Sequence, residues 1–293
     1  MTRRAWVLFA LLSVAWGLPY LLIKLAVAEV SVPVLVFARV FLGAAILIPF
    51  ALRGGQLARA FRFWRPLTAF SVLEFMVPWG LLSHAEIRLT SAMAGLLMAT
   101  IPMFTIAIEK LAGSAEPIGV QRAAGLLLGF AGVFLLATPD LGGDSRAVAE
   151  VLLAALSYAA AAVVAARPLR AVPALPMVTW CLGLAAVIYL PAAAMTWPTA
   201  VPSPRTIGAL AGLAGVCTAL AFVWYVGLIR EAGTARAVVV TYTNPAVAVA
   251  AGVIVLKEPV TPSMLVALLL ILGGSALATI RARSDAGVSY VER

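Results

Sequence analysis

The segment TSAMAGLLMATIPMFTIAIEKLAGSAEP, residues 90–117, has a counterpart in the other half of the chain, TARAVVVTYTNPAVAVAAGVIVLKEP, residues 234–259. Each copy is an apolar, helix-length run that is interrupted by one central proline, Pro102 or Pro245, and ends in Glu-Pro. The spacing from proline to glutamate is 14 residues in the first copy and 13 in the second. The offset between the copies is close to half the chain, which indicates an internal duplication. In an apolar chain, paired segments that proline interrupts point to a binding site between inverted repeats.

The composition is that of a polytopic membrane protein. Hydrophobic residues make up 63% of the chain and charged residues 11%, and the mean hydropathy is +1.07. Soluble domains carry about 25% charged residues. The links between the apolar runs are too short to fold as a soluble domain, so any chemistry must occur within the bundle. Runs long enough to cross about 30 Å of hydrocarbon are expected at residues 5–25, 33–52, 66–84, 91–111, 119–138, 147–166, 176–195, 206–229, 236–256 and 263–280.

The duplication extends beyond the quoted segment. A shift of 142 residues superposes Pro49 on Pro191 and Arg88 on Arg230. We therefore expect two repeats of five helices, residues 1–142 and 143–293. Because five is an odd number, the two copies must enter the membrane in opposite directions. The predicted fold is an all-α bundle of ten transmembrane helices arranged as two inverted repeats.

The net charge of +9 and the pI near 10.3 reflect basic residues that set the orientation of the chain in the membrane. If the N-terminus is placed in the cytoplasm, the cytoplasmic links hold most of the lysines and arginines. The positive-inside rule then predicts that both termini are cytoplasmic. The basic side chains would also attract anionic membrane lipid, and nucleic acid is not an expected partner. The basic residues on the predicted cytoplasmic side include Arg3, Arg4, Arg62, Arg65, Lys110, Arg122, Arg167, Arg170 and Arg230.

Motifs of soluble catalysis are absent from the sequence. It has no HExxH pair, no Walker glycine loop, no GxSxG elbow and no cluster of cysteine and histidine. We therefore expect no enzyme activity, no metal and no cofactor. A membrane-embedded enzyme acting on lipid would place polar groups near one interface, and a structural or sensory bundle would tolerate apolar replacement of its polar residues. The paired proline breaks favour a carrier over both.

Glu74 is the carboxylate that lies well within a predicted span. Intramembrane acids usually face the bundle interior and mark ion or substrate paths, so Glu74 is the first candidate for binding or coupling. A structural acid bonded to a neighbouring helix is the alternative. His84, at the outer end of the same span, is a candidate for coupling or gating, with an interfacial, water-facing residue as the alternative. Pro102 and Pro245 are candidates for gating.

Arg39 lies about two turns inside the second predicted span. A guanidinium at mid-membrane costs at least about 2.5–3.5 kcal/mol, so it should have a partner. The candidate partners are Glu29, Glu74 and backbone carbonyls at helix ends. A structural ion pair is favoured over direct contact with a substrate.

Several polar, soft and aromatic side chains are candidates for lining a central cavity. Tyr20 shares a face of the first span with Trp16 and Lys24, although packing and snorkelling would explain the same pattern. Thr241 and Asn244 are expected to share an inward face, unless they only satisfy carbonyls released by Pro245. The predicted substrate-binding residues are Tyr20, Glu74, Trp79, Met98, Thr100, Tyr158, Thr218, Tyr225, Thr241 and Asn244. By contrast, the GxxxG spacing of Gly125 and Gly129 predicts helix packing.

Three sequence features together resemble the EamA-type branch of the drug/metabolite transporter superfamily. They are the WG of SVAWGLPYLLIK (residues 13–24), the run VPVLVFARVF (residues 32–41) and the two proline-interrupted Glu-Pro blocks. The resemblance implies a carrier whose central cavity is formed by spans 1, 3, 4, 6, 8 and 9, with spans 5 and 10 peripheral. It also implies export of small metabolites, commonly amino acids, across the bacterial inner membrane by alternating access.

The residues narrow the substrate class. Carriers of sugar phosphates would need basic residues deep in the cavity, and this chain has only Arg39. A small multidrug-type pump would have its essential glutamate in the first span, where this chain has Tyr20 and Lys24. The predicted cavity suits an amphipathic zwitterion, with Glu74 at the ammonium and hydroxyls and Asn244 at the carboxylate. We expect an exporter of amino acids with apolar or aromatic side chains; the alternative is proton-antiport efflux of lipophilic drugs or cations. Proton coupling, and the choice between monomer and dimer, stay open.

Overall fold

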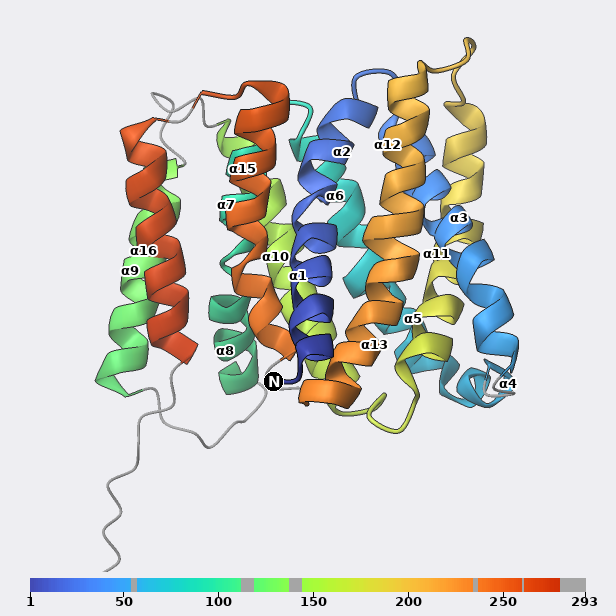
Figure 1. The fold of residues 1–293 in the computed structure, drawn as a ribbon, viewed down its shortest axis with the longest axis horizontal. Coiled ribbons are helices and arrows are strands. Elements are labelled where there is room, and N and C mark those ends of the chain that lie inside the picture. The colour runs from blue at the N-terminus through green and yellow to red at the C-terminus, as the bar shows by residue number, and fades with distance from the viewer. Residues whose placement is uncertain (54–56, 112–118, 137–143, 234–236, 260, 280–293) are drawn as a thin grey trace, which may run out of the picture.

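The computed structural model describes residues 1–53, 57–111, 119–136, 144–233, 237–259 and 261–279. Its elements are helical throughout the described residues (Figure 1). The first half contains α1 (Arg3–Gly17), α2 (Pro19–Ala26), α3 (Val32–Arg53), α4 (Leu57–Ala60), η1 (Phe61–Phe63), α5 (Trp64–Ser71), η2 (Val72–Met76), α6 (Val77–Ala85), α7 (Ser91–Met98), α8 (Ile101–Leu111) and α9 (Val120–Leu136). The second contains α10 (Ser145–Ala166), α11 (Ala174–Met195), α12 (Pro204–Ala214), η4 (Gly215–Leu220), α13 (Ala221–Ala232), η5 (Val238–Tyr242), α15 (Asn244–Leu256) and α16 (Pro262–Thr279).

The helices join into membrane-spanning segments that match the predicted spans. Two shorter apolar helices, Val120–Leu136 and Pro262–Ala278, occupy the places of the predicted fifth and tenth spans. The prediction of an all-helical, polytopic membrane fold is confirmed. By length and composition, eight segments of the described chain can cross a membrane: Arg3–Ala26, Val32–Leu52, Phe61–Ala85, Ser91–Leu111, Ser145–Ala166, Ala174–Met195, Pro204–Ala232 and Val239–Leu256.

Helices from the two halves pack as equivalent pairs. In chain order α3 is the second span and α11 the seventh, and these two pack together, as do α7 with α15 and α9 with α16. The first span packs on the eighth through α1 with α13 and α2 with α12, and the sixth packs on the third through α10 with α6. Each contact therefore joins a span of one repeat to the other repeat, and the two repeats interlock (Figure 1).

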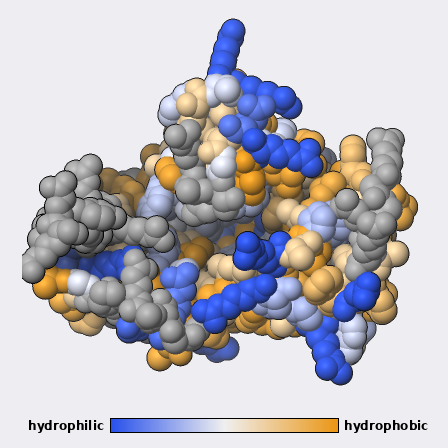
Figure 2. Space-filling view, turned by 90° about the horizontal axis from the view of Figure 1, so that it is seen from below, coloured by the Kyte–Doolittle hydropathy of each residue, from blue (hydrophilic) through white to orange (hydrophobic). Residues whose placement is uncertain are grey.

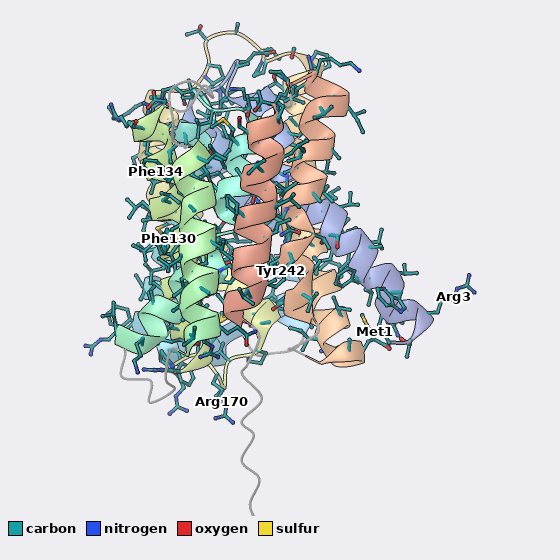
Figure 3. All side chains as sticks on the ribbon, turned by 90° about the vertical axis from the view of Figure 1, so that its left-hand side faces the viewer. Met1, Arg3, Phe130, Phe134, Arg170 and Tyr242 are labelled. Atoms are coloured by element: carbon teal, nitrogen blue, oxygen red, sulfur yellow. The ribbon has the colours of Figure 1, made fainter. Side chains whose placement is uncertain are left out.

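The pair α9 and α16 lies at one side of the bundle (Figure 1). A side chain at Gly274 would collide with the backbone of Gly125 and Gly129, so these glycines allow the helices to approach closely. The packing role predicted from the GxxxG spacing is confirmed. Phe130 and Phe134 project outward from α9 (Figure 3) and expose 45% and 77% of their surface. This pair is peripheral, as the family resemblance implied.

The two central prolines interrupt their helices as predicted. α7 ends at Met98 and α8 begins at Ile101, one residue before Pro102. In the other copy, the 3₁₀ turn η5 ends at Tyr242 and α15 begins at Asn244, before Pro245. Proline has no N–H to donate, so the preceding turn keeps free carbonyls. At each break a threonine hydroxyl also donates to a backbone oxygen of the preceding turn: Oγ1 of Thr100 lies 2.7 Å from the Leu97 oxygen, and that of Thr243 lies 2.7 Å from the Val240 oxygen. Each of these oxygens also accepts the backbone N–H of the same threonine.

Two π-helical turns, η2 and η4, interrupt the third and eighth spans at equivalent places. The sequence pattern did not predict them. Side chains from the second repeat bond to backbone oxygens of η2: Ser157 donates to Leu73 at 2.8 Å, and Tyr189 donates to Met76 at 2.8 Å. π turns within α-helices often occur at functional sites. η2 carries Glu74 and η4 carries Thr218.

The basic residues gather at the end of the bundle at which α1 begins. Arg3 and Arg170 both lie at that end (Figure 3), and hydrophilic side chains are plentiful on it (Figure 2). Exposed basic side chains from the predicted cytoplasmic links are Arg3, Arg4, Arg62, Arg65, Lys110, Arg167, Arg170 and Arg230. The two ends of the bundle thus differ in charge in the way that the positive-inside rule requires. Which end faces the cytoplasm stays a prediction.

Candidate functional site

Arg39 on α3 is the buried cation at the centre of the bundle. Its side chain is only 5% exposed. Nε donates a hydrogen bond to Oγ1 of Thr218 in η4, with a donor–acceptor distance of 3.1 Å. The guanidinium carbon lies 3.5 Å from the centroid of the Trp79 ring. Thr218 itself donates to the Leu213 oxygen at 2.8 Å, so its hydroxyl is held ready to accept from Arg39.

The polar contacts continue from Trp79 into the second repeat. Trp79 Nε1 donates to the Tyr158 hydroxyl at 2.7 Å. Tyr158, on α10, is close enough to Glu74 for an electrostatic interaction, and so is Tyr225 on α13. We call Thr218, Arg39, Trp79, Tyr158 and Glu74 the central polar chain. Direct contacts run from Thr218 in η4 to Tyr158 and cross between the repeats, and Glu74 in η2 lies near Tyr158 without a hydrogen bond to it.

Arg39 has no ion-pair partner among the described residues. Neither predicted partner reaches it. Glu29 lies in the loop between α2 and α3 and accepts hydrogen bonds from the Ser203 N–H at 2.7 Å and from the Ser203 hydroxyl at 2.6 Å. These bonds hold the pKa of Glu29 below its ordinary value. The guanidinium is instead stabilised by the Trp79 ring, through a cation–π contact, and by Thr218. The structural ion pair predicted for Arg39 is therefore wrong.

Glu74 also lacks a hydrogen-bond or ion-pair partner within the described part of the chain. Its side chain is partly exposed although it lies well inside its span. Aromatic rings pack around this region: the Trp16 ring lies 5.0 Å from that of Tyr225 and 6.0 Å from that of Phe222, measured between centroids. Phe75, next to Glu74, lies 6.0 Å from Phe222. The centre of the bundle thus combines one acid, one base and an aromatic surface.

The remaining predicted binding residues are distributed around this centre. Tyr20 is 7% exposed and lies beside Gly95 of α7. Met98 is buried at the end of α7. Thr241, in η5, and Asn244, at the start of α15, are partly exposed, but the break at Thr243 separates them, so they do not share a regular helical face. The buried oxygen of the Asn244 side chain has no hydrogen-bond partner.

Two further contacts concern the break itself. Thr243 Oγ1 lies 2.7 Å from Ser13 Oγ, which ties α1 to the interrupted ninth span. Thr100, which we expected at the substrate, is fully buried and its hydroxyl is used by the Leu97 oxygen. Tyr242 lies beside the break, between the two ends of the bundle (Figure 3).

His84 lies in an ion-pair cluster at the surface. Its Nδ1 is 2.8 Å from Oε2 of Glu150, and Nη2 of Arg88 lies 2.8 Å from the same oxygen. Arg88 also contacts Asp144 at 3.6 Å. The His84 side chain is 45% exposed. This setting favours the interfacial role over proton coupling.

Lys24, Glu86 and Glu258 lie at the end of the bundle opposite the N-terminus. The sequence analysis did not assign these charged residues to the site. Lys24 Nζ donates to the backbone oxygens of Glu86 and Leu89 at 2.6 and 2.8 Å. Glu258, beyond α15, accepts from the Ser91 N–H at 2.8 Å, the Ser91 hydroxyl at 3.0 Å and the Ala92 N–H at 3.0 Å. It caps the N-terminus of α7, where a negative charge is favoured. The Glu-Pro motif was a signal for this; its other copy, Glu116-Pro117, lies outside the described residues.

We call this region, around Lys24, Glu86, Leu89, Ser91 and Glu258, the closed end. All eight residues of α7, which begins there, are buried. In α8, which continues toward the opposite end, Met103 is the buried residue among those described. Side chains are therefore packed more tightly at the closed end than at the end where α1 begins.

A bundle of two interlocked repeats, with proline-broken spans and charged and aromatic side chains at its centre, defines a membrane transporter. The chain belongs to the EamA-like transporter family, whose sequence profile matches residues 4–138 and again residues 146–280. Membership in a transporter family agrees with the prediction that the chain is not an enzyme. Among the described residues, no group of three or more histidine, cysteine, aspartate or glutamate side chains could hold a metal ion.

Curated relatives and a solved structure extend the comparison. The chain is 31% identical over 254 residues to the uncharacterized inner membrane transporter YedA of Escherichia coli K12, covering 84% of this chain and 80% of YedA. It is 27% identical over 298 residues to the uncharacterized transporter YvbV of Bacillus subtilis, covering 97% and 94%. A solved crystal structure shares the fold, with a TM-score of 0.66, 20% identity and coverage of 96% and 98%.

Proposed function

We propose that the chain exports amino acids with apolar or aromatic side chains by alternating access, using the central polar chain as the binding site. One observation carries the proposal: Arg39, a base, and Glu74, an acid, lie at the bundle centre, and neither has an ion-pair partner in the described part of the chain. Intramembrane charges are costly unless paired, and a bound zwitterion would pair both.

The geometry suggests how such a substrate binds. A carboxylate at Arg39 would meet the planar guanidinium, which suits two parallel hydrogen bonds. The ammonium would lie at Glu74, on the other side of Trp79 and Tyr158. An apolar or aromatic side chain would pack on Trp16, Phe222 and Tyr225. This assigns the substrate carboxylate to Arg39, in place of the hydroxyls and Asn244 that the sequence suggested.

The cellular setting is part of the proposal. YedA is named an inner membrane transporter, and we infer that this chain too is a multi-pass protein of the bacterial inner membrane. With the basic end of the bundle in the cytoplasm, both termini would be cytoplasmic and the closed end would face outward. The conformation described here would then bind cargo from the cytoplasm.

The test is exchange in proteoliposomes, comparing a radiolabelled amino acid such as phenylalanine with its amide, which lacks the carboxylate. The wild-type protein should prefer the acid. Arg39→Gln should raise KM for the acid by about 10- to 150-fold, the loss expected for a charge-assisted hydrogen bond of ~1.5–3 kcal/mol, while the amide is little affected. Arg205→Gln, at an exposed position in the first turn of α12, is the control.

Preference for the acid over the amide is a ratio, so it is unaffected by a lower yield of folded protein. An unchanged ratio in Arg39→Gln would remove Arg39 from the site. Glu74→Gln should raise KM for both compounds, because both carry the ammonium. If no amino acid moves while lipophilic cations do, Glu74 within its aromatic surroundings supports drug efflux instead, and the amino-acid assignment fails.

A further inference from the structure

Glu86, at the end of α6, is a carboxylate that the transport site does not use. It is 0% exposed, and neither of its carboxylate oxygens has a hydrogen-bond partner. Ser83, one helical turn earlier, is also fully buried and its hydroxyl also has no partner. The closed end therefore contains an acid that is sealed from water and from donors.

The charged groups around Glu86 do not supply a donor. Those that act on its carboxyl are Lys24 on α2, Arg39 on α3 and Glu258 beyond α15, and the Tyr20 hydroxyl of α2 is also near. Lys24 Nζ is held by the backbone oxygens of Glu86 and Leu89. Arg39 bonds to Thr218, and Glu258 caps α7 and adds a second negative charge.

An ionised carboxylate in this position would have neither water nor a hydrogen-bond donor, and buried charges are tolerated only with one or the other. The neutral acid avoids that cost. The packing of the closed end therefore favours a protonated Glu86 carboxyl. Water must enter the closed end before this proton can leave.

We propose that the Glu86 carboxyl is a proton-binding site that controls the closed end, protonated while that end is shut and ionised when it opens. On opening, the O–H bond breaks and the proton passes to incoming water. The carboxylate then attracts Lys24 away from the Glu86 and Leu89 oxygens and repels Glu258 from the N-terminus of α7. The Lys24 bonds hold α2 against the segment that leads into α7, and the Glu258 bonds hold the end of α15 against the start of α7. Ionisation of Glu86 weakens both sets of bonds and therefore favours the open state.

The sign of the pH dependence follows from linkage. The closed state binds one proton more than the open state, so acid on this side favours closure and alkali favours opening. The ratio of open to closed molecules should rise by up to about tenfold per pH unit, the slope for one proton. This inference concerns the closed end alone and holds whatever the cargo is.

Opening can be measured without a substrate, by thiol labelling. In a background with both natural cysteines replaced by alanine, Leu89→Cys places a thiol at the closed end, where Leu89 is 1% exposed. Ala200→Cys, in the exposed link before α12, reports the reactivity of a free thiol at each pH. The measured quantity is the rate of maleimide labelling of Leu89→Cys divided by that of Ala200→Cys, in proteoliposomes between about pH 6 and about pH 8, where one proton sets the slope.

The ratio should rise steeply with pH in the protein that retains Glu86. Glu86→Gln, which imitates the protonated acid, should keep the ratio low and flat, and Glu86→Asp should restore the pH dependence. Glu29→Gln, an exposed carboxylate in a neighbouring loop, should leave the profile unchanged. A flat ratio with Glu86 present, or a wild-type profile in Glu86→Gln, would overturn the proposal. Failure of the amino-acid assay would leave this result unaffected.

Discussion

Arg39 illustrates what a single buried charge requires of its surroundings. The sequence predicts that a guanidinium at this depth needs a partner, and that prediction rests on desolvation alone. The partner is an aromatic face and a hydroxyl, from residues 40 and 179 positions away in the chain. Such a partner depends on how α3, α6 and η4 are placed against one another, which the order of residues within one span does not specify.

The Trp79 side chain makes two distinct contacts, which substitutions can separate. Trp79→Phe keeps a ring under Arg39 but removes the hydrogen bond to Tyr158, so the free energy of unfolding should fall by about 1 kcal/mol. Trp79→Leu also removes the cation–π contact and should cost about 1–2 kcal/mol more. Thermal unfolding in detergent would measure both. Equal losses in the two variants would contradict a stabilising contact between the ring and Arg39.

At the scale of helices, the sequence predicts the breaks at proline better than it predicts the π turns. The breaks before Pro102 and Pro245 follow from the missing N–H of proline, a property of one residue. The π turns η2 and η4 contain no proline, and they depend on contacts with other helices. Ser157 and Tyr189, from α10 and α11, bond to the backbone of η2. A π turn that is stabilised by neighbouring helices cannot be recognised from the residues of its own helix.

The glycines of α16 offer a matched pair for testing helix packing. An added Cβ at Gly274 would collide with the backbone of α9, whereas one at Gly273 would enter open space. Gly274→Ala should therefore lower the thermal midpoint, because α9 and α16 must move apart. Gly273→Ala should be neutral or stabilising by up to about 1 kcal/mol, since alanine favours the helix more than glycine does. Similar midpoints for the two variants would show that this close approach adds nothing to stability.

At the scale of the whole molecule, the duplication predicts the two repeats but neither the way in which their helices interlock nor the full site. Glu74, Trp79, Tyr158 and Thr218 were chosen as polar or aromatic residues in predicted spans. The structure joins Trp79, Tyr158 and Thr218 through Arg39 by direct contacts, and it places Glu74 near Tyr158 without a hydrogen bond. Thr100 met the same criterion, yet its hydroxyl is used by its own helix. Composition identifies residues that must avoid lipid, but it does not separate those facing the centre from those facing a neighbouring helix.

The orientation of the whole bundle can be tested with two exposed positions at opposite ends. Ala200 lies in the link before α12, and Ala171 lies in the link between α10 and α11, beside Arg170. In intact cells, an impermeant thiol reagent should label Ala200→Cys and leave Ala171→Cys unlabelled until the membrane is broken. The expected asymmetry follows from the positive-inside rule. Labelling with the opposite preference would invert the assignment of the closed end to the outside.

The ties at the closed end have a practical consequence for protein engineering. Lys24 and Glu258 hold together elements that must separate if the bundle is to open there. The same bonds add to heat resistance in the closed form and to the barrier of the transport cycle. Selecting variants of this chain for thermal stability alone would therefore enrich slow carriers, and a useful screen would have to score turnover at the same time.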